Sequence, residues 1–157
     1  NVSDGIPDVT NPAQVTIEYV DNNGTVAATQ EMSLAAGAIG SIWLPSIPGL
    51  PDGFVGGARI TADQDIIAVG RPHLGSEITA YNGTSGGSTS AYLSMLFKNA
   101  YSAPYQAAFY IQNTSENTAN VAISFYDSAG ALSCFKSISL AANATRGFWM
   151  PTVNCAP

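Results

Sequence analysis

The chain has 157 residues, a formal net charge of −6 and five lysine and arginine residues in all. These basic residues are scattered, so nucleic-acid binding and attraction to an anionic membrane are both disfavoured. Charged residues make up 10% of the sequence, far below the usual quarter, and serine, threonine and asparagine take the polar positions. This composition is typical of secreted β-proteins, and we expect an extracellular protein.

The sequence contains no run of about twenty apolar residues, so we expect no membrane span. Residue 1 is asparagine and not methionine, and the sequence contains no signal-peptide pattern. We therefore expect a processed mature form or an excised segment.

Alternating hydrophobicity predicts strands, and helical periodicity is absent. The first strand is expected over residues 15–20, with Val15, Ile17 and Tyr19 pointing inward. Residues 21–24 read Asp-Asn-Asn-Gly, which predicts a hairpin turn. Further strands are expected over 25–34, 41–44, 55–61, 66–69, 78–81, 92–98 and 105–112.

The chain also repeats itself once. Residues 11–51 align without a gap with residues 117–157, an offset of 106, and the strand layout of the first copy is expected again in the second. Recurrence of the same inward positions predicts a shared core. The expected core residues are Val15, Ile17, Tyr19, Trp43, Val121, Ile123, Phe125 and Trp149.

Short strands at spacings near ten residues indicate an all-β sandwich or barrel. The expected organisation is an N-terminal arm over 1–10, a first sandwich unit over 11–82 and a truncated second unit over 91–157. Residues 83–90 are rich in glycine, serine and threonine and are either a linker or a long loop.

The repeat is incomplete at both ends. The strands over 88–116 precede only the second copy, and the strands over 52–87 follow only the first. Unpaired strand edges are adhesive, and natural proteins cover them. We expect a second copy of the chain to cover them by strand exchange, which gives a homopolymer.

Several segments resemble the repeat modules of secreted bacterial cell-surface proteins. In those modules an I-x-V-Q-N-x-S strand leads into A-N-V-x-I-x-Y-x-D-x-x-G, which is similar to residues 111–115 and 119–130 here. Residues 50–54, 65–70 and 92–99 are similar to other parts of the modules, and the resemblance covers most of residues 11–157. It implies Ig-like antiparallel β-sandwich modules on the cell surface, with no established chemistry.

The two cysteines, Cys134 and Cys155, both lie in the second copy. In a secreted protein an even count favours one disulfide, here closing a loop of about twenty residues and contributing roughly 3 kcal/mol. The alternative is two buried free thiols. A metal pair lacks the further ligands that it would need.

Five Asn-x-Ser/Thr triplets make glycosylation the stronger site hypothesis, since several fall at expected turns. The alternative is coincidence in a sequence rich in these residues. The candidate acceptors are Asn1, Asn23, Asn82, Asn113 and Asn143.

Catalytic motifs are absent from the sequence, and we expect neither an enzyme nor a cofactor. His73 is the only histidine, and no nucleophile elbow, phosphate loop or metal-ligand cluster accompanies it. The acidic turns at 21–24 and 63–65 supply too few carboxylates for a calcium site, and ordinary turn chemistry explains them.

The sequence therefore predicts a structural protein, the self-assembling subunit of a surface filament or sheath. The alternative is an adhesion or carbohydrate-binding module excised from a tandem array. The aromatic residues of segment 101–105 are interpreted as a simple loop in preference to an interface or a carbohydrate patch.

Overall fold

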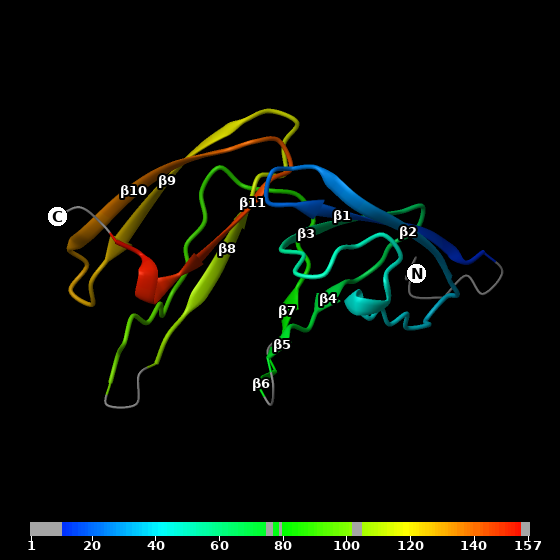
Figure 1. Cartoon of the computed structure of the whole chain (residues 1–157), viewed down its shortest axis with the longest axis horizontal. Helices are drawn as coiled ribbons and strands as arrows, with labels where there is room; N and C mark the ends of the chain where they lie inside the picture. Colours follow the sequence, from blue (N-terminus) through cyan, green and yellow to red (C-terminus); the bar gives the residue numbers. More distant parts are fainter. Residues whose placement is uncertain (1–10, 75–76, 79, 102–104, 155–157) are drawn as a thin grey trace. The chain divides into compact units, whose positions relative to one another are not determined.

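A computed structural model of the chain describes residues 11–74, 77–78, 80–101 and 105–154. Within these residues the regular elements are antiparallel strands and two short 3-10 turns, without an α-helix (Figure 1). The expected all-β class is confirmed. The expected arm over 1–10 lies outside the described residues.

The chain divides into two compact units. One contains residues 11–19, 26–53 and 58–87, and the other contains residues 20–25, 54–57 and 88–154. The change from one unit to the other near residue 87 falls within the segment rich in glycine, serine and threonine. Each unit is described separately below.

The principal sheet of the first unit has the strand order β2-β1-β3. These strands are β1 (Ala13–Asp21), β2 (Val26–Leu34) and β3 (Gly56–Ala62). The inward residues of the central strand, Val15, Ile17 and Tyr19, are at most 5% exposed. Alternation thus places one face of β1 in the core, while strands on both sides protect its edges.

Two-residue strand pairs complete the regular structure described in this unit. They are β4 (Val69–Gly70) with β7 (Tyr81–Asn82), and β5 (His73–Leu74) with β6 (Glu77–Ile78). The 3-10 turn η1 (Leu44–Ser46) begins at the last residue of the segment over 41–44, which was expected to be a strand.

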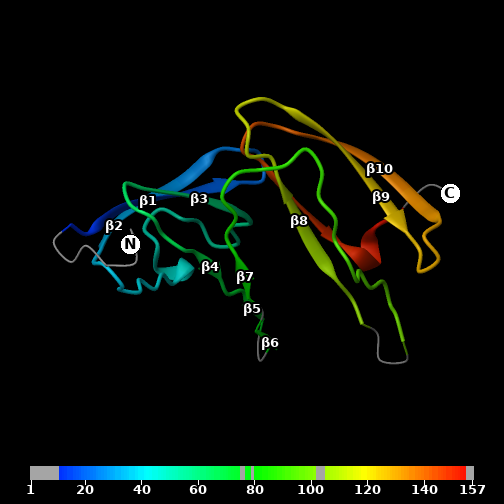
Figure 2. The ribbon, with the colours of Figure 1, turned by 180° about the vertical axis from the view of Figure 1, so that it is seen from behind.

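In the second unit, two two-stranded antiparallel sheets face each other (Figure 2). One pairs β9 (Ala119–Tyr126) with β10 (Leu132–Leu140), and the other pairs β8 (Ala108–Gln112) with β11 (Thr145–Trp149). After β11 comes the 3-10 turn η2 (Met150–Thr152). This arrangement is that of a small sandwich.

The core of the second unit is a cluster of four buried residues, Phe109, Phe148, Met150 and Val153. The Phe109 and Phe148 rings stack with their centroids 4.9 Å apart. Partly buried side chains from the facing hairpin close the cluster; they include Ile123 and Phe125 from β9 and Ile138 from β10.

Asp21 and Asp127 build the two hairpin turns. The Asp21 carboxylate accepts hydrogen bonds from the backbone N–H groups of Asn23 (2.8 Å) and Thr25 (2.9 Å). Gly24 closes this turn at φ +90°, and a β-carbon there would overlap the backbone of Ala142. Glycine is therefore required both by backbone conformation and by space.

The turn after β9 has the same construction. The Asp127 carboxylate accepts hydrogen bonds from the N–H groups of Ala129 and Ala131, both at 2.9 Å, and Gly130 has φ +82°. An aspartate that binds the backbone two and four residues ahead thus stabilises both hairpins.

The structure corrects the expected core at both tryptophans. Trp43 is 59% exposed and Trp149 is 46% exposed. Successive side chains of a strand point to opposite faces, so the inward position in β11 belongs to Phe148 and its neighbour Trp149 points away from the cluster. The β9 residues Val121, Ile123 and Phe125 are half-buried.

Two expected strands are also corrected, because the described residues over 41–44 and 92–98 lie in no ladder. Both segments have strand-like composition. A strand also requires a hydrogen-bonding neighbour, and an isolated extended segment is unstable by itself.

Candidate functional site: open strand edges and an aromatic pocket

Open strand edges are the dominant feature of the described structure. Among the described strands of the second unit, β8, β9, β10 and β11 each have a single hydrogen-bonded neighbour. Among those of the first unit, β1 has two neighbours, whereas β2 and β3 have one each. An edge strand presents unpaired N–H and C=O groups that readily pair with another chain.

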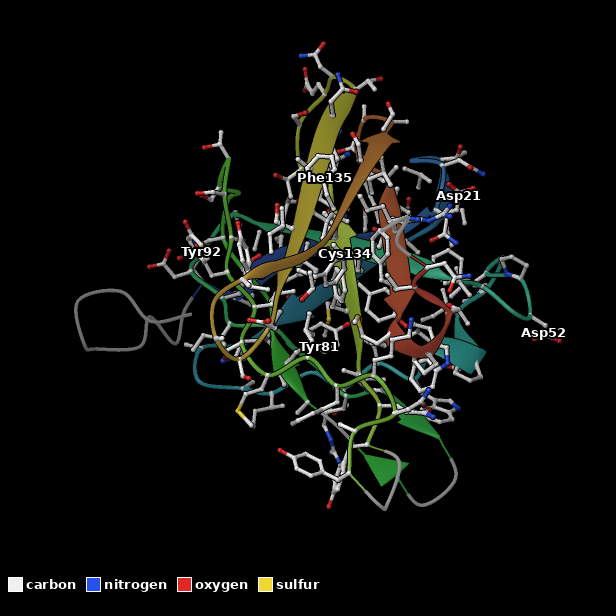
Figure 3. The ribbon with its side chains drawn as sticks, turned by 90° about the vertical axis from the view of Figure 1, so that its left-hand side faces the viewer. Asp21, Asp52, Tyr81, Tyr92, Cys134 and Phe135 are labelled. Atoms are coloured by element: carbon white, nitrogen blue, oxygen red, sulfur yellow. The ribbon has the colours of Figure 1, made fainter. Side chains whose placement is uncertain are left out.

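Several large apolar side chains are exposed among the described residues. Tyr92 (labelled in Figure 3) is 96% exposed, Ile39 is 93% exposed and Ile67 is 88% exposed. Met95 is 77% exposed and holds a left-handed backbone conformation, with φ +59°. A left-handed conformation is unfavourable for a residue with a β-carbon. It also differs from the extended conformation expected for Met95 within the predicted strand over 92–98.

A shallow pocket of about 360 Å³ lies on the β8–β11 sheet. Tyr110 is 65% exposed and pairs with Gly147, where a β-carbon would approach the tyrosine ring to 2.8 Å. Glycine thus lets the ring lie flat over β11. The pocket is lined by Asn22, Val55, Ala108, Tyr110, Arg146, Gly147, Phe148 and Trp149.

The pocket combines two exposed aromatic side chains, a guanidinium group and an amide. Aromatic rings stack on apolar faces, while the polar groups supply directional hydrogen bonds. Trp149 was expected in the core, and neither Tyr110 nor Arg146 was predicted to belong to a site. The alternation of Phe109 with Tyr110 was the signal that places the tyrosine outward.

Asn113 is the most heavily hydrogen-bonded side chain described, and it is 7% exposed. Its Nδ2 donates to the carbonyl oxygens of Asn117 (2.7 Å), Ala141 (2.9 Å) and Leu140 (3.2 Å). Its Oδ1 accepts from the backbone N–H (3.1 Å) and the hydroxyl (2.8 Å) of Ser115.

Asn113 is therefore a wrong assignment among the glycan acceptors, because the nitrogen that would carry the sugar is buried and bonded. Asn23 and Asn82 are exposed, and Asn143 is half-buried with φ +60°. Asn1 lies outside the described residues.

The predicted disulfide pairs Cys134, in β10, with Cys155, which lies outside the described residues. It stays a prediction.

The carboxylates of Asp21 and Asp63 accept hydrogen bonds from backbone N–H groups. Asp63 Oδ1 accepts the Gln14 N–H at 2.7 Å, and the backbone hydrogen bonds from Thr25 and Asn23 lower the pKa of Asp21. No group of three or more metal-ligating side chains occurs in the described part of the chain. His73 lies in β5, in a part of the chain whose side chains are not described.

The aromatic residues around segment 101–105 form a small exposed cluster. The Phe97, Tyr101 and Tyr105 rings lie about 6 Å from one another, and the two tyrosines are 76% and 58% exposed. Residues 102–104 between them lie outside the described residues.

Among the described residues, no helix is long and apolar enough to cross a membrane. Comparison with protein-family models, with curated proteins and with solved structures finds no match to this chain.

Proposed function

We propose that this protein is an extracellular structural subunit that assembles with copies of itself by adding strands at its open sheet edges. The observation that carries the proposal is the set of open strand edges: among the described residues, β8, β9, β10 and β11 each have one hydrogen-bonded neighbour. Such edges readily pair with another chain. The product would be a surface filament or sheath.

The internal repeat supports the same proposal. β2 over 26–34 and β10 over 132–140 have the same offset of 106 as the aligned sequences, and so do the two 3-10 turns over 44–46 and 150–152. Each chain thus carries two copies of one hairpin unit with different surrounding strands. In the assembly, each unit would become a complete Ig-like sandwich.

The extracellular location rests on the low content of charged residues and on the resemblance to secreted surface modules. The disulfide between Cys134 and Cys155, and glycans on Asn23 or Asn82, belong to this part of the proposal. The intact mass of the native protein, before and after reduction, checks both.

Sedimentation velocity and negative-stain electron microscopy of the purified chain test self-assembly. We expect a concentration-dependent series of oligomers and, at high concentration, fibres. The expectation rests on edge pairing, so mild denaturant is expected to shorten the fibres before the monomer unfolds. A single 16.2 kDa species at every concentration would contradict the proposal.

The pocket on the β8–β11 sheet favours a second candidate function, that of a carbohydrate-binding adhesion module. A glycan array would then give binding, and Trp149→Ala is expected to weaken it at least about tenfold because a stacked aromatic ring is lost. Tyr126→Ala is the matched control, because Tyr126 is 64% exposed on β9 and does not line the pocket. Equal binding by both variants would exclude this pocket.

A further inference from the structure

Two exposed tyrosines of the second unit lie in ring contact with each other. The centroids of the Tyr101 and Tyr105 rings are 5.9 Å apart, and the ring planes are perpendicular. The Phe97 ring lies 6.0 Å from each of them. Since the two tyrosines are 76% and 58% exposed, their phenol groups are in contact with each other and also open to solvent.

Backbone hydrogen bonds hold the two arms of this segment together. The Ala107 N–H donates to the carbonyl oxygen of Phe97 at 3.0 Å. Nearer the tyrosines, Ala100 and Tyr105 form a β-bridge in which each N–H donates to the other residue's carbonyl oxygen, at 3.1 and 3.0 Å. The bridge places Tyr105 opposite the residue that precedes Tyr101, so the backbone itself brings the two tyrosines close.

The backbone of Tyr101 is also constrained. Its φ is +64°, in the left-handed region that is unfavourable for a residue with a β-carbon. Such conformations persist where the surrounding contacts hold them, and they are concentrated at functional positions. Here the described contacts are the adjacent bridge at Ala100 and the rings of Phe97 and Tyr105.

We propose that Tyr101 and Tyr105 are coupled into a dityrosine when a haem peroxidase and hydrogen peroxide oxidise the chain. Haem enzymes carry out one-electron oxidations. Each phenol loses the hydrogen atom of its hydroxyl group, and the two phenoxyl radicals form one C–C bond between an ε-carbon of each ring. The hydrogens on those two carbons move to the phenol oxygens as the rings regain aromaticity. The tyrosine pair thus loses two hydrogen atoms in all, and one hydrogen peroxide is reduced to two waters.

Proximity favours this pair over coupling between chains. Two groups that are held together react in an effectively unimolecular step, whereas tyrosines on separate chains must first meet. Exposed side chains change rotamer within picoseconds to nanoseconds, so two rings in edge-to-face contact readily bring their edges together. Their exposure also leaves both phenol groups accessible to the oxidant.

Other tyrosines lack this combination of exposure and contact. Tyr19 is 3% exposed and is therefore shielded from the oxidant. Tyr92 and Tyr126 are 96% and 64% exposed, but within the described ranges neither has an aromatic ring in contact with its own. These two are accessible to a peroxidase and lack a neighbouring phenol with which to couple.

Oxidation of the dilute full chain with a haem peroxidase and hydrogen peroxide tests the site. The products are treated with dithiothreitol, so that disulfides do not contribute to the mass change, and separated by denaturing electrophoresis. We expect the monomer to show dityrosine fluorescence and to have lost the mass of two hydrogen atoms. The bond lies within one chain, so the test is independent of self-assembly, which sedimentation velocity of the unoxidised chain measures separately.

Tyr101→Phe and Tyr105→Phe keep the ring and remove the phenol group. Each is expected to lower the dityrosine fluorescence of the monomer at least about tenfold, because the remaining coupling requires an encounter between separate chains. Tyr126→Phe is the matched control, since it removes one exposed tyrosine outside the pair and is expected to leave the signal unchanged. An oxidised monomer without dityrosine, dityrosine confined to covalent dimers, or an equal signal in all three variants would overturn the site.

Discussion

Replacing Phe148 with alanine is expected to lower the free energy of unfolding of the second unit by about 3–5 kcal/mol. Phe148 is 6% exposed and stacks on Phe109 with centroids 4.9 Å apart. The fully buried cluster has only four members, so the facing hairpin cannot readily fill the space left by the ring. Urea denaturation followed by circular dichroism measures the loss.

The adjacent residue supplies the control. Trp149 is larger than Phe148 but 46% exposed on the opposite face of the same strand, so Trp149→Ala is expected to cost less than half as much. An equal or larger loss at Trp149 would show that the faces of β11 are reversed. It would also remove Trp149 from the pocket.

Alternating hydrophobicity predicted side-chain faces better than it predicted strand pairing. The strand expected over 15–20 lies within β1, and its inward residues are at most 5% exposed. The segments over 41–44 and 92–98 have similar composition and no ladder. Alternation encodes which face is apolar, whereas a ladder depends on a partner that is remote in sequence or in another chain.

Recurrence between the two copies was misleading about burial. Trp43 and Trp149 occupy aligned positions, and both are exposed, at 59% and 46%. Trp149 lies in β11, whereas Trp43 lies outside the described strands. A repeated aromatic residue is therefore not by itself evidence of a core position.

The incomplete repeat predicted open strand edges. It did not predict which side chains are buried or which hydrogen bonds they make. The interpretation of Asn113 as a glycan acceptor followed from a three-residue motif. Its buried hydrogen bonds depend on carbonyl groups of residues 117, 140 and 141, of which two belong to a distant part of the sequence. The run Asn-Thr-Ser-Glu-Asn over 113–117 is also typical of side-chain-to-backbone turns, which was the available signal.

Replacing Asn113 with aspartate is therefore expected to cost about 3 kcal/mol of stability at neutral pH. The side chain keeps its shape and its acceptor for Ser115, but the Nδ2 donor becomes an oxygen facing the carbonyls of Asn117, Leu140 and Ala141. Buried acceptors without donors carry their full desolvation penalty, and the added charge increases it. The penalty is expected to shrink in acid, because a protonated carboxyl group regains one donor.

Asn120→Asp makes the same chemical change at an exposed position of β9 and is expected to alter stability by less than about 0.5 kcal/mol. Urea denaturation at neutral and acidic pH compares the two variants. Because Asn113 joins the segment before β9 to the segment after β10, its loss is expected to loosen both sheets of the second unit together. Equal stability of the two variants, or a loss at Asn113 that does not respond to acid, would show that this amide does not hold the two segments together.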